Sequence, residues 1–340
     1  MTRLFLVSLG ALLLSGCQSA LFGVINARQS STGVVAHHDI VYDPSDGLAL
    51  DVYGPVDAKN APVVVFLYGG SWKSGKRQWY RWVGEALAAR GIVTVVSDYR
   101  QWPKVRLDGF MQDGANAVRW AHDHAGDFGG DAAHLFVMGH SAGGHIAALL
   151  ATDGRWLDAV GMKPRDLSGF IGLAGPYDFL PLTNDDFIDM FGQTAEQQAR
   201  SQPVNFVDGD EPPALLLQGE SDSTVKPSNA LSLQRRYAAQ GEHVEVKLYP
   251  DTGHMGVLFG LGTGNHKAPV LDDVVTFIRQ QSRPPSVTAP SSHRALPHCH
   301  HAPHPALPGT DSSAPATGEY PGSRSRRTPQ AAPPACLPSA

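Results

Sequence analysis

The stretch Gly139-His140-Ser141-Ala142-Gly143-Gly144 decides the fold of this chain of 340 residues. It follows the apolar residues 135–138 and precedes the apolar residues 146–150, a pattern typical of a strand, a sharp turn and a helix. The glycines on both sides of the serine let the helix turn back closely beneath the strand. Such a turn exposes the serine hydroxyl and leaves the next amide near the helix N-terminus, where it can donate to a developing oxyanion. The stretch therefore favours acyl transfer, with Ser141 as the nucleophile.

A carboxylate that could orient a catalytic base follows a later apolar run. Residues 214–218 predict a buried strand, and the loop after this strand contains Glu220 and Asp222. In open parallel sheets, catalytic groups gather beyond the C-terminal ends of the strands, which is where this loop would lie. On position alone, either carboxylate could be the acid.

One of the fifteen histidines stands where a serine nucleophile needs its base. His254 follows the alternating run 244–249 through the turn-forming residues 250–253, and it precedes a predicted helix over about 268–280. The order serine, acid, histidine along the chain is that of the α/β-hydrolase triad. The histidines expected to be solvated or hydrogen-bonded within the fold are His37, His38, His122, His124, His140 and His145.

A glycine-rich loop after another predicted strand could supply further amides. Residues 63–67 predict this strand, and Tyr68-Gly69-Gly70-Ser71-Trp72 follows it directly. Glycines allow backbone amides to approach a reacting carbonyl closely. In α/β-hydrolases the oxyanion hole pairs the amide after the nucleophile with one from this loop, which often carries a His-Gly-Gly-Gly type sequence. In this chain Tyr68 stands at the position of the histidine.

With these motifs the chain resembles the serine esterase branch of the α/β-hydrolase superfamily. It is most similar to carboxylesterases with a His-Gly-Gly-x-Trp loop, a group that includes bacterial esterases, prenylcysteine methylesterase-like proteins and arylformamidases. The resemblance extends from about Ala49 to Ile278 and includes residues 97–100 (Ser-Asp-Tyr-Arg) and Asp113. We expect Asp98, Arg100 and Asp113 to be structural, with Asp113 anchoring neighbouring backbone. The departure at Tyr68 bears on substrate range more than on activity.

The resemblance implies a role for each site residue. Ser141 would be the nucleophile and His254 the base. Asp222 would be the orienting acid, because its spacing to Val225 and Pro227 matches the family. The implied oxyanion donors are the amides of Gly70, Ser71 and Ala142.

The resemblance predicts hydrolysis of short- to medium-chain carboxylic esters through an acyl-enzyme, with no cofactor and no metal. Two alternatives remain: hydrolysis of an activated amide such as an aryl formamide, which needs the same groups, and a non-catalytic binding protein of the cell envelope. Trp72, Trp102 and the polar, irregular segment 175–213 are candidates to line the substrate pocket, and this segment could fold over the site as a small lid.

The predicted fold class is α/β, with a mostly parallel central sheet and helices on both of its faces. Continuous apolar runs predict strands that are buried on both faces, and residues 79–87 carry an apolar stripe with helical spacing between two of them. The predicted strands lie at 63–67, 92–96, 135–138, 170–174 and 214–217. We assign residues 39–283 to one catalytic domain and residues 18–38 to a linker.

The first seventeen residues resemble a bacterial lipoprotein signal. Arg3 precedes an apolar stretch, residues 4–14, that is too short to span a bilayer, and Leu14-Ser15-Gly16-Cys17 follows as a lipobox. By this resemblance Cys17 becomes lipidated after cleavage and anchors the protein in the membrane of the bacterial cell envelope. Because Gln18 is not aspartate, attachment to the outer membrane is favoured. The alternative is an ordinary secretory signal and a periplasmic protein.

The last part of the chain has a different composition. Thirteen prolines occur among residues 284–340, with abundant alanine, serine and histidine, so this tail is expected to be disordered and receives no function. Cys299 and Cys336 both lie in it, which leaves the catalytic domain without a disulfide. The formal net charge of −5 gives no reason to expect a nucleic-acid partner.

Overall fold

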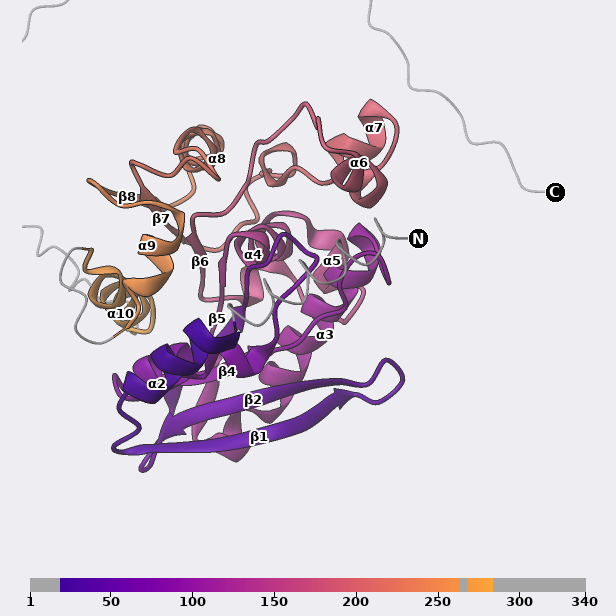
Figure 1. Cartoon of the computed structure of the whole chain (residues 1–340). Helices are drawn as coiled ribbons and strands as arrows, with labels where there is room; N and C mark the ends of the chain where they lie inside the picture. The colour runs from indigo at the N-terminus through magenta and orange to yellow at the C-terminus, as the bar shows by residue number, and fades with distance from the viewer. Residues whose placement is uncertain (1–18, 263–267, 284–340) are drawn as a thin grey trace, which may run out of the picture. The chain divides into compact units, whose positions relative to one another are not determined.

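The computed structural model describes residues 19–262 and 268–283. Its centre is an eight-stranded sheet in the order β1-β2-β4-β3-β5-β6-β7-β8 (Figure 1). The strands are β1 (Val34–Asp43), β2 (Leu48–Pro55), β3 (Ala61–Leu67), β4 (Val93–Ser97), β5 (Gly130–His140), β6 (Gly169–Leu173), β7 (Ala214–Gly219) and β8 (Val244–Tyr249). β2 pairs antiparallel with β1 and with β4, and every other pair in this sheet is parallel. The expected mostly parallel α/β sheet is confirmed.

Helices connect the parallel strands. The α-helices are α2 (Arg81–Ala88), α3 (Leu107–His124), α4 (Ala142–Thr152), α5 (Gly154–Asp158), α6 (Asp185–Phe191), α7 (Ala195–Ala199), α8 (Ser228–Gln240), α9 (His254–Phe259) and α10 (Val270–Gln281). Short 3-10 helices are η1 (Arg77–Tyr80), η2 (Ala125–Phe128), η3 (Pro164–Asp166) and η4 (Pro203–Asn205). Residues 19–28 form a further helix, called here the N-terminal helix.

The strand order places helices on both faces of the sheet. The chain moves from β3 to its neighbour β4 in one direction and then crosses back over β3 to reach β5. Because crossovers between parallel strands are right-handed, these two opposite moves put α2 and α3 on opposite faces. α10 packs against α2, whereas α4 packs against α3. The sheet between them is apolar on both sides, since every residue of β4 and β6 is buried.

The register of the sheet brings the functional loops to one edge. Leu67 at the end of β3 pairs with Gly139 near the end of β5, so the glycine-rich loop lies beside the Ser141 turn. Gly219 at the end of β7 pairs with Tyr249 at the end of β8, which places the two loops that follow side by side. The chain adds β4 on one side of β3 and β5 on the other, and in open α/β sheets ligands bind at the carboxyl ends of the strands where the order reverses in this way.

The range 18–38 differs from the expected linker in its described part. It contains the N-terminal helix and the first residues of β1, and Phe22 on that helix is buried. Asn26 fixes the helix to the main domain, because its side chain accepts a 3.0 Å hydrogen bond from the amide of Trp82 and donates a 2.9 Å bond to the carbonyl of Gln78. A short helical segment that is held by a few tertiary contacts has little local pattern in its sequence, because packing supplies most of the stability of helices in proteins.

Candidate active site

Ser141 occupies a sharp turn between β5 and α4. Its backbone has φ 55° and ψ −121°, in the left-handed half of the φ range that residues other than glycine rarely adopt. The positions on either side of it have no room for a side chain, because a Cβ atom on Gly139 would lie 2.2 Å from the carbonyl oxygen of Gly143. A Cβ atom on Gly143 would lie 2.0 Å from the carbonyl oxygen of Leu67. The close approach of helix to strand that the glycines predicted is therefore present.

Ser141, His254 and Asp222 form a hydrogen-bonded chain. The Ser141 Oγ lies 2.9 Å from His254 Nε2, and His254 Nδ1 lies 2.8 Å from Asp222 Oδ2. The three residues come from the turn after β5, the first position of α9 and the loop after β7. Ser141 and His254 are partly exposed, whereas Asp222 is buried. This geometry allows the imidazole to take the serine proton while the carboxylate stabilises the imidazolium.

Asp222 is held in place by its own loop and by the strand before it. Its Oδ1 accepts hydrogen bonds from the amides of Thr224 and Val225, both at 2.9 Å. Its Oδ2 accepts a 3.0 Å bond from Gln218 Nε2 in addition to the bond with His254. Four hydrogen bonds therefore fix the position of the carboxylate beside His254. The competing carboxylate of Glu220 is exposed, and in the described part of the chain the hydrogen bond to His254 Nδ1 comes from Asp222 instead.

The loop after β3 lies next to Ser141 with an unusual backbone. Gly70, Ser71 and Trp72 have φ values of 138°, 53° and 57°. A Cβ atom on Gly70 would lie 2.0 Å from the carbonyl oxygen of Ser74, so this tight turn needs glycine. The loop closes through bonds from the Lys73 and Ser74 amides to the Gly70 carbonyl, both at 3.0 Å.

The amides expected to form the oxyanion hole are available in this arrangement. Ala142 is the first residue of α4, so its amide has no partner within the helix. Gly70 and Ser71 stand in the loop, and Ser71 lines cavities together with Ser141. Within the described residues, no hydrogen bond takes up these three amides. These amides can therefore donate to an oxygen, and their role as the oxyanion hole stays a prediction.

Tyr68, at the position where related loops carry histidine, fixes this loop from behind. It is buried between Tyr80 and Tyr99, whose ring centroids lie 5.3 and 4.8 Å from its own. Its hydroxyl lies 3.0 Å from Asp98 Oδ1, and burial together with the Asp98 charge raises the pKa of Tyr68 well above its usual value. The hydroxyl is therefore protonated and donates to the carboxylate. Gln101 Nε2 donates to the carbonyl of Gly75 at 2.9 Å and closes the other side of the loop.

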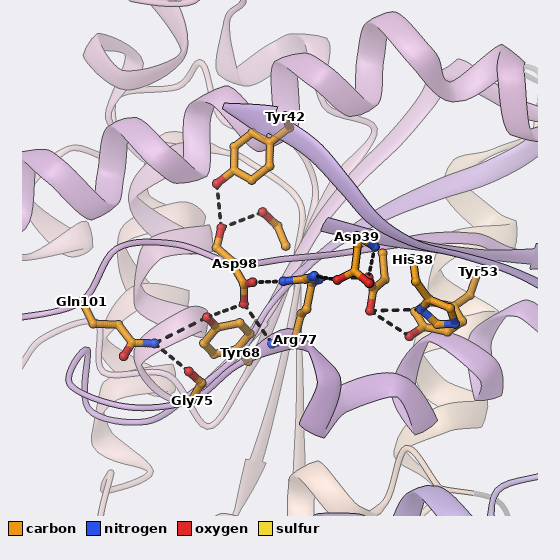
Figure 2. Close-up of polar contacts among 11 residues, drawn as sticks. His38, Asp39, Tyr42, Tyr53, Tyr68, Gly75, Arg77, Asp98 and Gln101 are labelled. Carbon is orange, nitrogen blue, oxygen red and sulfur yellow. Dashed lines mark hydrogen bonds and ion pairs between the residues drawn. The ribbon is translucent and has the colours of Figure 1, made fainter. Parts of the chain in front are cut away.

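An ion cluster around Arg77 supports Tyr68 (Figure 2). The buried guanidinium contacts three carboxylates, those of Asp39 on β1, Asp51 on β2 and Asp98 after β4. The amide of Arg77 also donates to Asp98 Oδ1 at 2.9 Å. The cluster links the sheet edge to the base of the glycine-rich loop, so Asp98 is structural, as expected. Asp113 is also structural, because its Oδ2 accepts a 2.7 Å bond from the Arg100 amide and the carboxylate pairs with the Arg100 guanidinium.

Two cavities meet at Ser141. The first, called here the aromatic cavity, has a volume of about 260 Å³. It is lined by Ser71, Trp72, Ser141, Pro176, Phe179, Pro181, Leu182, Thr183, Phe187, Thr224 and Val225. None of these side chains is ionisable. The lining includes part of the segment 175–213, as expected.

The second cavity, called here the base-side cavity, has a volume of about 190 Å³. It is lined by Phe22, Gly69, Gly70, Ser71, Ser74, Gly75, Trp79, Tyr80, His140, Ser141, Thr224, His254 and Met255. Sequence reasoning missed Phe22 and Met255 and gave Trp79 a packing role. No local pattern distinguishes these side chains from ordinary core residues, since only the tertiary fold brings them to Ser141.

The two tryptophans named as pocket candidates have different surroundings. Trp72 lines the aromatic cavity, and its ring meets those of Phe187 and Phe191 edge-on at 5.7 and 4.9 Å between centroids. Trp102 lines neither of the two cavities at Ser141. Its Nε1 donates a 2.8 Å hydrogen bond to Asp189 on α6. Trp102 therefore holds the segment that carries α6 against the domain.

His140 lies next to the base without taking part in the hydrogen-bonded chain. Its ring centroid lies 4.8 Å from that of His254, and its Nε2 lies 3.3 Å from the His254 carbonyl oxygen. Burial, with a smaller contribution from His254, lowers the pKa of His140 to about 3. The imidazole is therefore neutral at neutral pH and leaves the proton transfer to His254.

The lipidation site Cys17 and the tail 284–340 lie outside the described residues. Within residues 19–262 and 268–283, none of the helices combines the length and the apolar character needed to span a bilayer.

Comparisons with known proteins agree with the fold. A family model described as BD-FAE matches residues 50–237, which is more than half of the chain. Isoprenylcysteine alpha-carbonyl methylesterase ICME of Arabidopsis thaliana is 26% identical over 270 residues, covering 71% of this chain and 62% of its own length. Esterase LipC of Mycobacterium tuberculosis is 29% identical over 265 residues, covering 72% of this chain and 65% of its own length. The matched part thus spans less than two thirds of either relative.

A solved structure shows the same architecture. Esterase B from Lactobacillus Rhamnosis (HN001) matches with a TM-score of 0.67 at 21% sequence identity, covering 83% of this chain and 96% of that protein. The α/β-hydrolase fold expected from the sequence is therefore confirmed.

Proposed function

Because the chain belongs to the BD-FAE family, we propose that it is a serine hydrolase that cleaves short- to medium-chain carboxylic esters. The observation that carries the proposal is the hydrogen-bonded chain Ser141–His254–Asp222, with distances of 2.9 and 2.8 Å, beside three available amides. A serine hydroxyl is a poor nucleophile at neutral pH, and a positioned imidazole removes that barrier.

The reaction proceeds in two halves. In the first, Ser141 Oγ attacks the ester carbonyl while His254 Nε2 takes the hydroxyl proton, and the developing oxyanion accepts bonds from the Ala142 amide and from the loop amides of Gly70 and Ser71. The protonated His254 then gives the proton to the leaving alcohol, and an acyl-enzyme remains. In the second half, His254 deprotonates a water molecule that attacks the acyl carbonyl. The bond between Ser141 Oγ and the acyl carbon then breaks, the carboxylic acid leaves, and His254 returns the proton to Ser141.

The aromatic cavity supports a neutral, apolar substrate of modest size. Its lining side chains are not ionisable and include Trp72, Phe179 and Phe187. A volume of about 260 Å³ lies slightly below the usual range for sites that hold drug-sized ligands, which runs from roughly 300 to 1,000 Å³. A short or medium acyl chain fits this space better than a long one.

The test is hydrolysis of p-nitrophenyl esters from acetate to palmitate by the purified full chain and by its Ser141→Ala variant. We expect turnover that depends on Ser141 and is highest for short and medium acyl chains. An aryl formamide in the same panel tests amide hydrolysis, because both reactions pass through a tetrahedral oxyanion. Higher kcat/KM for the formamide than for every ester would replace the ester proposal. Absence of turnover by a folded protein would favour a binding function.

We also propose that the protein is a lipoprotein of the bacterial cell envelope, anchored at Cys17. The support is the sequence Leu14-Ser15-Gly16-Cys17 after a short apolar stretch. The test is incorporation of labelled palmitate and fractionation of membranes, for the full chain and for Cys17→Ser. We expect label and membrane attachment only with the cysteine. A Cys17→Ser protein that stays in the membrane fraction would contradict lipidation, and separation of inner and outer membranes tests the preference for the outer membrane.

A further inference from the structure

The two cavities that meet at Ser141 differ in their relation to the base. His254 lines the base-side cavity, whereas the lining of the aromatic cavity does not include it. Ser71, Ser141 and Thr224 line both, so the reacting carbonyl would sit at their junction. The acyl chain and the alkoxy group of a bound ester could therefore each occupy a separate cavity.

The requirement for proton transfer assigns the leaving alcohol and the acyl chain to different cavities. The leaving alkoxide must receive its proton from His254 Nε2, so its oxygen has to lie within hydrogen-bond distance of that nitrogen. Of the two cavities at Ser141 in the described residues, the base-side cavity is the one that His254 lines. The leaving group would therefore occupy the base-side cavity, and the acyl chain would occupy the aromatic cavity.

The outer wall of the base-side cavity comes from the N-terminal helix. Phe22 is 5% exposed, and its ring stacks on Trp79 with 5.5 Å between centroids and an angle of 8°. It also contacts Tyr80, at 5.2 Å between centroids. The hydrogen bonds of Asn26 to Trp82 and Gln78 hold the helix in this position. Phe22 therefore has a fixed place, and a fixed side chain can set the shape of a subsite.

The chemistry of the wall specifies the kind of group that fits. Phe22, Trp79, Tyr80 and Met255 present rings and a thioether, which favour an apolar and preferably aromatic group. Besides the base, the ionisable side chains of the lining are Tyr80 and His140, and burial keeps both neutral at neutral pH by raising the pKa of the first and lowering that of the second. The cavity thus offers no charge that would pair with an ionic alcohol.

We infer that Phe22 is a specificity residue for the leaving group. With Trp79 it forms a subsite for apolar, preferably aromatic, alcohols of the size of benzyl alcohol. This inference rests on the proposed ester hydrolysis and adds to it the class of the alcohol and the part that the N-terminal helix has in the active site. A methoxy group fills only a small part of a cavity of about 190 Å³, so methyl esters should be much less sensitive to this residue.

The experiment compares methyl butyrate with benzyl butyrate for the wild-type full chain and for Phe22→Ala. We expect kcat/KM for benzyl butyrate to fall about tenfold and kcat/KM for methyl butyrate to change less than about twofold, since one apolar contact changes specificity by factors of this order. Benzyl acetate and benzyl hexanoate should lose the same factor as the butyrate, because the acyl chain does not contact Phe22. The matched control is Leu21→Ala, a half-exposed neighbour on the same helix that should leave all four substrates unchanged.

Equal losses for methyl and benzyl esters, or a loss that varies with acyl length, would overturn the inference. Phe22→Leu is a second test variant in case Phe22→Ala disturbs the helix. Leucine keeps an apolar side chain at this position but cannot stack on Trp79. For it we expect weaker product inhibition by benzyl alcohol and unchanged product inhibition by butyrate. Unchanged inhibition by both would also overturn the inference. Failure of the wild type to hydrolyse any ester would instead contradict the proposed function.

Discussion

The Tyr68 hydroxyl donates a 3.0 Å hydrogen bond to Asp98 Oδ1, and the same carboxylate pairs with the buried Arg77 (Figure 2). One side chain thereby connects the loop that supplies the oxyanion amides to the ion cluster at the sheet edge. The tyrosine delivers a single donor to a partly buried carboxylate and thereby supports the loop from behind.

Tyr68→Phe should therefore reduce stability more than catalysis. The change removes a hydrogen bond to a charged acceptor, which is worth roughly 1.5–3 kcal/mol, and we expect a fall in kcat of less than about tenfold. Urea unfolding and steady-state kinetics measure the two effects. Tyr249→Phe is the matched control, because the Tyr249 hydroxyl donates a 2.7 Å bond to Asp273, a carboxylate on α10. It should lose similar stability without any loss of kcat. A loss of kcat that is larger than a hundredfold in Tyr68→Phe alone would assign the hydroxyl a direct catalytic role.

Asp222→Asn should lower kcat about ten-thousandfold, because the amide cannot hold the imidazole in the tautomer that accepts the serine proton. The amides of Thr224 and Val225 both donate to Oδ1, so the asparagine oxygen would take that position and its NH₂ would face His254. Ester hydrolysis at saturating substrate measures the effect. Glu220→Gln, in the same loop, should stay within about twofold of the wild type. The reverse ranking would show that the acid has been assigned to the wrong residue.

Gly143→Ala should destabilise the fold by about 3 kcal/mol or more, because the added methyl group would lie 2.0 Å from the carbonyl oxygen of Leu67 and neither backbone can yield easily. Thermal unfolding and soluble yield report the loss. Gly126→Ala places the same methyl group where no atom of another residue lies within 4 Å, and it should stay within about 1 kcal/mol of the wild type. Equal stability of the two variants would mean that Gly143 and the Leu67 carbonyl lie farther apart than in this structure.

Stability should fall as the pH decreases from about 7 towards 4. Burial lowers the pKa of His145 to about 4 and that of His140 to about 3, whereas a histidine of an unfolded chain titrates near 6.5. Between these values the unfolded state binds protons at both sites and the folded state does not, so unfolding becomes more favourable at lower pH. Denaturant unfolding measured from pH 8 to pH 5 checks the slope.

His145→Gln should reduce this slope by about one proton, because it removes one of the two linked sites. Comparison at pH 8, where His145 is neutral in both states, separates the packing cost of the substitution from the proton linkage. A slope that is the same in the variant and the wild type would contradict the assignment. His145 is well placed for this test, since its Nε2 contacts the Ser201 carbonyl oxygen at 2.6 Å and not the triad.

The sequence allowed the parallel part of the sheet to be predicted. Continuous apolar runs fixed β3 to β7 to within a few residues, because strands that are buried on both faces need such runs. The position of His254 followed from the order of elements, and the structure places it within hydrogen-bond distance of Ser141 and Asp222. The lid role of the segment 175–213 and the lipidation of Cys17 stay predictions.

Other features depend on contacts between distant parts of the chain and have no local signature. β1 carries mixed polar and apolar residues, since it lies at the sheet edge and is mostly exposed. Among residues 19–28, the described part of the N-terminal helix, Phe22 is the only buried residue. Trp79 belongs to the predicted helical stripe, and it also lines the cavity that contains Ser141. The helical pattern predicted its packing but not its place in the cavity. In each case tertiary packing decides the outcome and propensity does not.

The position of Phe22 has a consequence for where the protein works. Cys17 precedes it by five residues, so the chain allows at most about 18 Å between their Cα atoms. Acylation of Cys17 would make these residues a short tether, and the alcohol subsite would be confined to a thin layer of water above the lipid headgroups. Esters that partition into the membrane would then meet the enzyme at a high effective concentration, whereas esters dispersed through the bulk solution would gain nothing from the anchor.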